Sequence, residues 1–284
     1  MASEARTGEF IDWHTHLYLP EHRTGKDYEN MVRRGVAGGG KAAPDQHRAA
    51  MRDGGVTKVL VAPSARSAHA KVPNDFIADY VKSFPGTAIG FCSVHPNDAN
   101  ALEEVERSVK TLGLRGLKLS PTYQAVDPIA RESWALYELA RDLKIPIMFH
   151  CGGGYTGSLK YSDPSRLDEV AQAFPELKLL IAHLGQPYME QTIILMRKNE
   201  NVWADLSARF HRKWQLYNGL MVAQEYGVTS RLLFGSDFPV RWPKAAEAEF
   251  KAINDWGPDV KLPRIPDKLI EDILYNRPFN LFGF

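Results

Sequence analysis

Two histidines stand two residues apart at the end of an apolar run near the start of the chain. The stretch Phe10–Leu17 reads Phe-Ile-Asp-Trp-His-Thr-His-Leu, and its aromatic and β-branched residues favour a buried strand. In an extended chain, residues i and i+2 point to the same face, so His14 and His16 would present their imidazoles side by side. Paired imidazole nitrogens suit a divalent metal ion. His-x-His also occurs by chance as two ordinary histidines, so the rest of the chain has to decide between these interpretations.

Three further residues of the same chemistry stand where other apolar runs end. His150, His183 and Asp237 come at the ends of the fifth, sixth and eighth such runs along the chain. A single histidine at a strand end is more often structural than functional. Four runs that all finish on His or Asp are hard to explain by packing alone, and imidazoles with a carboxylate suit zinc, manganese or iron(II).

The elements that must position these residues are short and evenly spread. The apolar, β-rich runs are Phe10–Leu17, Lys58–Ser64, Ala88–Val94, Leu114–Pro121, Ile145–Cys151, Leu177–Gly185, Asn201–Ala208 and Arg231–Pro239. Several of them are almost continuously hydrophobic, which is typical of parallel strands that are covered on both faces.

Helical patterns fill the intervals between these runs. Helices are predicted over Pro44–Asp53, Glu132–Leu143, Pro164–Phe174 and Pro266–Leu274 from their start signals and apolar spacing. Strand and helix alternating across residues 1–284 predict one domain with an α/β fold, a (β/α)₈ TIM barrel. The alternative is a doubly wound open sheet, which is disfavoured because no Gly-x-Gly-x-x-Gly follows an early strand. In a barrel, the predicted His and Asp side chains would gather at the C-terminal ends of the strands.

Composition narrows the class of partner. The 284-residue chain is 44% hydrophobic and carries a formal net charge of +1, so neither nucleic acid nor an anionic membrane is expected to bind it. No apolar run reaches the roughly 20 residues of a membrane span. Two cysteines, Cys92 and Cys151, are too few for a disulfide framework, and a cytoplasmic location is expected.

Several motifs in order along the whole chain resemble one family. They are Asp12-Trp13-His14-Thr15-His16, Gly116-Leu117-Lys118-Leu119-Ser120-Pro121, Phe149-His150-Cys151-Gly152, Ala182-His183-Leu184-Gly185, and Phe234-Gly235-Ser236-Asp237-Phe238-Pro239. The chain is similar to the amidohydrolase superfamily, and within it to the amidohydrolase-related group that includes aminocarboxymuconate-semialdehyde decarboxylase.

This resemblance implies a distorted barrel that binds one divalent metal ion, with zinc favoured and manganese or iron(II) as alternatives. It implies that His14, His16, His150 and Asp237 are the metal ligands, with Asp237 also catalytic. His183 would act nearby as acid/base or as polariser of a substrate carbonyl. A homodimer is expected at the level of the family only.

Lys118 admits more than one role. It stands near the end of the fourth run, where some members of the superfamily carry a carbamylated lysine that bridges two metals. Its amine could equally pair with a substrate carboxylate or with Asp237. We favour one metal ion, with Lys118 as a polar neighbour.

Basic residues follow several of the predicted strands, and together they suggest a positively charged entrance that attracts a small anionic substrate. Arg209 or Arg241 could hold a carboxylate with two hydrogen bonds. Tyr123 and Trp13 could offer flat surfaces to an unsaturated ring, although packing is the ordinary role of such residues.

Three functions are consistent with these residues. The favoured one is a metal-dependent hydrolase of a small carboxylated lactone, amide or ester, which would use a metal-activated water. The Lys118 motif and a compact chain without a long extra arm favour it. The second is a non-oxidative decarboxylase of an aromatic or muconate-type acid, built from the same residues. The third is a catalytically silent barrel that binds a ligand, and the complete set of His and Asp residues argues against it.

Overall fold

The computed structural model describes residues 8–35, 40–67, 70–154 and 156–284. Its strands are β1 Ile11–Thr15, β2 Lys58–Val61, β3 Ala65–Ser67, β4 Ala70–Lys71, β5 Ala88–Gly90, β6 Cys92–Ser93, β7 Leu117–Leu119, β8 Ile147–Phe149, β9 Leu179–Ile181, β10 Val202–Asp205 and β11 Leu232–Leu233. The β-rich runs of the sequence therefore all contain strands, each shorter than the run that predicted it.

The helices lie between these strands and cover them. The α-helices are α1 Lys26–Arg33, α2 Pro44–Gly54, α3 Asn74–Lys82, α4 Ala101–Lys110, α5 Pro121–Gln124, α6 Arg131–Asp142, α7 Asp168–Ala173, α8 Met189–Lys198, α9 Lys213–Glu225, α10 Pro243–Lys251 and α11 Asp267–Tyr275. Short 3₁₀ turns occupy Pro20–His22, Leu159–Tyr161, Pro164–Leu167, Ala182–Gly185, Thr229–Arg231 and Phe279–Phe282. The predicted helices are thus present, the third as a 3₁₀ turn that runs into α7.

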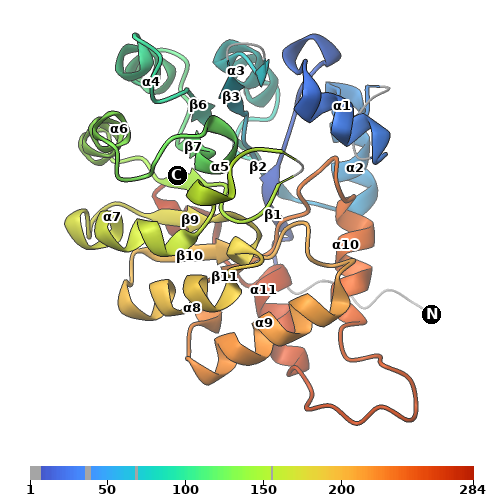
Figure 1. Ribbon diagram of the computed structural model, residues 1–284. Coiled ribbons are helices and arrows are strands. Elements are labelled where there is room, and N and C mark those ends of the chain that lie inside the picture. The colour runs from blue at the N-terminus through green and yellow to red at the C-terminus, as the bar shows by residue number, and fades with distance from the viewer. Residues whose placement is uncertain (1–7, 36–39, 68–69, 155) are drawn as a thin grey trace.

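The strands form a parallel ring with the helices outside it (Figure 1). The order β1-β2-β5 makes one sheet and β6-β7-β8-β9-β10-β11 the other. β5 and β6 belong to one stretch of chain interrupted at Phe91, whose N–H donates to Val61 on one side while that of Cys92 donates to Gly116 on the other. The only antiparallel pair among the described strands is β3 with β4, which the sequence did not predict.

Backbone hydrogen bonds between the first and last strands close the ring. The N–H of Trp13 donates to Phe234 O at 3.0 Å, and Thr15 forms a parallel bridge with Phe238 beyond the end of β11. The N–H of Asp237 donates to His14 O and that of His16 to Phe238 O, both at 2.8 Å. The fold is therefore the α/β TIM barrel that the sequence predicts, and the doubly wound sheet is ruled out.

Two apolar clusters hold the barrel together. A large one lies between the strands and the surrounding helices, and a small one lies within the ring of strands. The small cluster contains Ile11, Trp13, Leu60, Phe91, Met148, Leu180, Leu233 and Phe282. It fills the inside of the barrel as side chains do in this fold, so the barrel has a packed core and no pore. In the described part of the chain, no helix is both long and apolar enough to cross a membrane.

Candidate metal centre

The end of β1 brings His14 and His16 to the same place. The pairing of β1 with β2 is irregular between Asp12 and Thr15, which interrupts the simple alternation of faces along the strand. Asp12 stabilises this irregular turn, since its Oδ1 accepts the N–H groups of His14 at 3.2 Å and Ser236 at 2.9 Å. The side chain of His14 is fully buried and that of His16 is 13% exposed.

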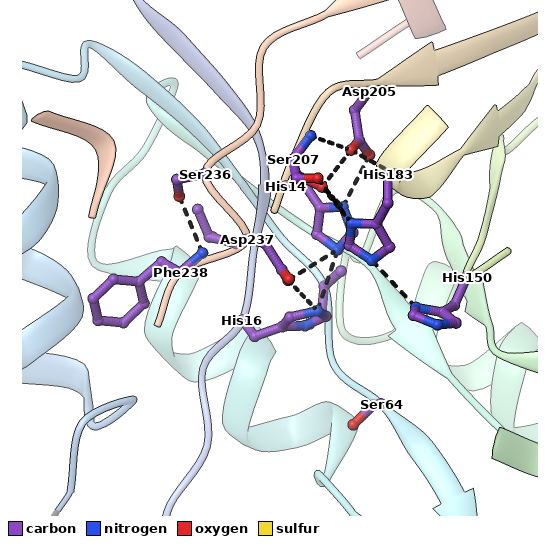
Figure 2. A network of polar contacts seen from close by, with 12 residues as sticks. His14, His16, Ser64, His150, His183, Asp205, Ser207, Ser236, Asp237 and Phe238 are labelled. Atoms are coloured by element: carbon purple, nitrogen blue, oxygen red, sulfur yellow. Dashed lines mark hydrogen bonds and ion pairs between the residues drawn. The ribbon is translucent and has the colours of Figure 1, made fainter. Parts of the chain in front are cut away.

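Asp237 completes a group of three at this point. The Nε2 atoms of His14 and His16 lie 3.2 Å apart, and Asp237 Oδ1 lies 3.3 Å from the second and 3.8 Å from the first. Figure 2 shows the two rings and the carboxylate converging from opposite ends of the chain. The three ligand atoms all lie within 4.8 Å of one another, which is close enough for one ion to contact them all.

The hydrogen bonds of the two Nδ1 atoms show which nitrogen of each imidazole is free to bind a cation. His14 Nδ1 lies 2.9 Å from Asp205 Oδ2, and His16 Nδ1 lies 2.6 Å from Ala62 O. Carboxylate and carbonyl oxygens only accept, so in the neutral imidazoles the proton is on Nδ1 and the lone pair is on Nε2. Two Nε2 lone pairs and a carboxylate oxygen that face one another repel unless a cation lies between them. The donor set therefore fits a divalent metal ion.

His183 and His150 adjoin this group on its other side. The His183 ring stacks on that of His14 with centroids 4.9 Å apart, and its Nε2 lies 3.2 Å from His150 Nδ1. His183 has a left-handed backbone with φ of 60° just after β9, and its N–H donates to Asp205 Oδ1 at 3.0 Å. His150 thus contacts the cluster through His183, and the five His and Asp residues expected at the strand ends lie together.

Asp205 is the residue of the site that the sequence analysis missed. It ends β10, is fully buried, and binds His14 through one oxygen and Ser207 through the other. The signal was available, because an aspartate interrupts the apolar run Val202–Leu206 at the level where neighbouring strands carry His or Asp. A carboxylate behind a metal-binding histidine fixes its ring orientation and raises its basicity.

The ionisable groups of the site are held in definite states. Burial is the main cause that lowers the pKa of His16 to about 4 and that of His183 to about 3, which keeps both rings neutral at pH 7. Burial acts to raise the pKa of Asp205 and Asp237, but the neighbouring histidines outweigh it and hold both well below the usual range. The site thus combines neutral imidazoles with ionised carboxylates, as a cation requires.

A cavity of about 340 Å³ opens onto His150, His183 and Asp237. It is lined by Arg34, Tyr123, His150, Gly153, Gly154, His183, Gln186, Pro187, Ala208, Arg209, His211, Arg212, Asp237 and Val240. Arg209 is only 8% exposed, and the Tyr123 ring lies 4.7 Å from that of His150. A buried arginine and a flat ring beside the cluster suit a small, planar anion.

The other expected substrate contacts lie elsewhere. Trp13 is fully buried and packs on Phe279 and Phe282 inside the barrel. Arg241 forms an ion pair with Glu249 of α10 through two hydrogen bonds, one of them Nε to Oε2 at 3.0 Å. Neither residue lines the cavity. The structure therefore corrects the expectation that Trp13 and Arg241 reach the substrate.

Lys118 lies beside His14. Its side chain is 1% exposed and its Nζ lies 3.5 Å from His14 Nε2. Its role, as a polar neighbour of one metal ion or as a carbamylated bridge between two, stays a prediction.

A protein-family model and solved structures match this chain. The family model described as amidohydrolase matches residues 11–284. No curated protein matches the chain. The matching solved structures include an uncharacterized TIM-barrel protein from Bordetella bronchiseptica, which is 20% identical with a TM-score of 0.71 over 94% of this chain and 96% of that one.

Two of the similar structures have a stated activity. One is a probable 2-pyrone-4,6-dicarboxylic acid hydrolase from Acinetobacter baumannii with citric acid bound, 17% identical with a TM-score of 0.69 over 97% of this chain and 100% of that one. The other is a dihydroxybenzoic acid decarboxylase from Polaromonas sp. JS666 with bound manganese and the inhibitor 2-nitroresorcinol, 17% identical with a TM-score of 0.69 over 97% of each chain. At these identities the likeness shows the fold alone.

Proposed function

Since the chain belongs to the amidohydrolase family, and is thereby an enzyme of a metal-dependent superfamily, we propose that it is a hydrolase of a small carboxylated lactone, amide or ester. The observation that carries the proposal is the convergence of His14, His16 and Asp237, because Asp237 also lines the cavity that contains Arg209. The ion favoured for this site is zinc, with manganese and iron(II) as alternatives. When bound, such an ion lowers the pKa of water and polarises a carbonyl group.

His14, His16 and Asp237 are the proposed ligands, with His150 as the fourth. Arg209 binds a carboxylate of the substrate and so orients its reactive carbonyl toward the cluster, while Tyr123 covers one face of the substrate. The carboxylate oxygen of Asp237 that does not hold the ion accepts a proton from the attacking water and returns it to the leaving oxygen or nitrogen as the carbonyl–heteroatom bond breaks. His183 also lines the cavity, and its Nε2 accepts a hydrogen bond from the attacking water and so orients it.

Decarboxylation of an aromatic or muconate-type acid is the second candidate. The similar solved structures that carry decarboxylase names support it, including one with bound manganese. In that reaction the carbon–carbon bond to the carboxylate breaks, CO₂ leaves, and a proton is delivered to the ring carbon. His183 and Asp237 would be the groups that move this proton.

Elemental analysis of the purified protein tests the metal site first. Close to one divalent ion per chain is expected, and the double variant His14→Ala/His16→Ala should lose it, because two of the proposed ligands are removed. Close to two ions per chain would instead assign Lys118 as a carbamylated bridge. No metal after reconstitution would refute the metal-dependent mechanism.

A substrate screen then separates the two reactions. Cyclic lactones with carboxylate substituents and hydroxybenzoic acids would be incubated with the metal-loaded protein. Ring-opened product without CO₂ supports the hydrolase, and released CO₂ supports the decarboxylase. Asp237→Asn is the control, since loss of the carboxylate should stop either reaction.

A further inference from the structure

The carboxylate of Asp205 is where the hydrogen bonds of the site meet. Its Oδ2 faces His14 Nδ1 at 2.9 Å. Its Oδ1 accepts the backbone N–H groups of His183 and Ser207, each at 3.0 Å, and also a hydrogen bond from the Ser207 hydroxyl. One side chain on β10 therefore contacts a residue of β1 and a residue shortly after β9 (Figure 2).

The single proton of the Ser207 hydroxyl is used by Asp205. Asp205 Oδ1 already accepts two backbone N–H groups, so the Ser207 hydroxyl is the donor of the hydrogen bond between the two side chains. The same hydroxyl oxygen lies 2.7 Å from His183 Nδ1. Because the Ser207 hydroxyl donates its hydrogen to Asp205, its oxygen can only accept a hydrogen bond from His183. The proton of His183 is therefore on Nδ1.

A second contact gives the same answer independently. His183 Nδ1 also lies 3.3 Å from the carbonyl oxygen of Ser207, which can only accept. When His183 is neutral, its proton is thus on Nδ1 and its lone pair is on Nε2. His183 and His150 both line the cavity, and this Nε2 lies 3.2 Å from His150 Nδ1.

We propose that Ser207, anchored by Asp205, is a positioning residue that fixes the Nδ1–H tautomer of His183 and so presents its Nε2 lone pair at the cavity. The role assigned to His183 in catalysis rests on the proposed function, whereas the tautomer does not. The same hydroxyl lies 3.1 Å from His14 Nδ1, so one serine couples the orientation of the acid/base histidine to that of a proposed ligand. An Nε2 lone pair makes His183 a proton acceptor toward a bound molecule until it is protonated.

The experiment reads the tautomer directly by NMR. Two-bond ¹H–¹⁵N correlation spectra of the zinc-loaded, ¹⁵N-labelled protein distinguish protonated from unprotonated ring nitrogens, and His183→Asn identifies the signals of His183. The wild-type protein should show protonated Nδ1 and unprotonated Nε2 at this residue. Ser207→Ala keeps only the longer contact of Nδ1 with the backbone carbonyl and should therefore give a mixture of the two tautomers. Ser207→Thr keeps the hydroxyl and should show the wild-type pattern.

Two further measurements accompany the spectra. Asp205→Asn should weaken zinc binding in chelator competition by about 10- to 100-fold, because it removes the charged partner of His14. Ser207→Ala should weaken zinc binding much less, since the contact between His14 and Asp205 remains. For any acid that the wild-type protein turns over, Ser207→Ala should lower kcat by about 10- to 100-fold and leave KM within a few-fold.

Ser133→Ala is the matched control, because this serine is equally buried but donates to Asp127 O away from the site. It should leave the His183 signals unchanged. An unchanged Nδ1–H tautomer in Ser207→Ala, or an Nε2–H tautomer in the wild-type protein, would overturn the proposal. Failure to find a substrate would count against the proposed function and leave the NMR result standing.

Discussion

At the scale of single residues, Asp237 and His183 both line the cavity but have different surroundings. Asp237 touches His16, whereas His183 stacks on His14 and is held from behind by Ser207. Both residues have a left-handed backbone, with φ of 60° in each case. Non-glycine residues adopt this conformation at a cost, and here hydrogen bonds from each backbone N–H to a neighbouring strand offset it.

Replacing either residue should remove activity without unfolding the protein. Asp237→Asn keeps the size and polarity of the side chain, and His183→Asn keeps a polar side chain, but both remove the ability to exchange a proton. We expect kcat to fall by about 10²- to 10⁴-fold. Activity assays paired with circular dichroism melts would show this, and wild-type rates in either variant would refute the assigned roles.

At the scale of elements, His47 connects helix α2 to β1, the strand that carries His14 and leads into His16. Its Nε2 lies 2.9 Å from Thr15 Oγ1 in β1, and its Nδ1 lies 2.7 Å from Tyr80 of α3. Thr15 stands between His14 and His16, so this buried contact helps to fix the end of β1. Burial is the main cause that lowers the pKa of His47 to about 3.

This shift predicts how stability changes with pH. The folded protein binds the His47 proton less tightly than the unfolded chain, whose histidine has a pKa near 6.5. The contribution of neutral His47 to the free energy of unfolding is therefore fully present above pH 6.5. It is lost as pH falls from 6.5 toward 3, at up to about 1.4 kcal/mol per pH unit. Urea unfolding of wild-type and His47→Gln proteins should show their stability difference changing by this amount per unit between pH 6 and 4.5. Parallel pH profiles for the two proteins would contradict the prediction.

The elements also show what the sequence could and could not predict. Continuous apolar runs that end on His or Asp were enough to predict the barrel and to bring His14, His16, His150, His183 and Asp237 to one end of it. The irregularity in β1, the break at Phe91 and the β3–β4 pair depend on local geometry that no repeat of residue types encodes.

Three residue assignments show the same limit. Trp13 packs inward because the aromatic residues that meet it come from the other end of the chain. Arg241 forms an ion pair with Glu249, eight residues later, because the loop before α10 and the start of that helix bring the two side chains together. Asp205 escaped notice because its partner His14 is 191 residues away in sequence.

At the scale of the whole molecule, the C-terminal segment seals one end of the barrel. Phe282 packs edge-on against Trp13 and Trp203, and Phe284 lies against Phe91 and Phe282. Arg115 donates to Gly283 O at 3.0 Å, and Lys178 donates to Leu281 O. The strands thus present the proposed metal centre at one end and rest on an aromatic cluster at the other.

Phe282→Ala should therefore destabilise the entire fold. The side chain is 5% exposed, and its loss leaves a cavity beneath the strands, with an expected cost of about 3–5 kcal/mol. Val260→Ala is the control, because Val260 is 49% exposed and should change stability by less than about 0.5 kcal/mol. Urea titrations of both variants would measure the difference, and equal midpoints would show that the segment contributes little.

The closure of the ring between its first and last strands has a consequence for how the protein is made. Asp237 leaves the ribosome 221 residues after His16, counted from position 16 to position 237. On the ligand set proposed above, a nascent chain holds no complete site until β1 and the residues that follow β11 have both been translated. A bound ion would then join these two segments, so that metal binding depends on closure of the ring.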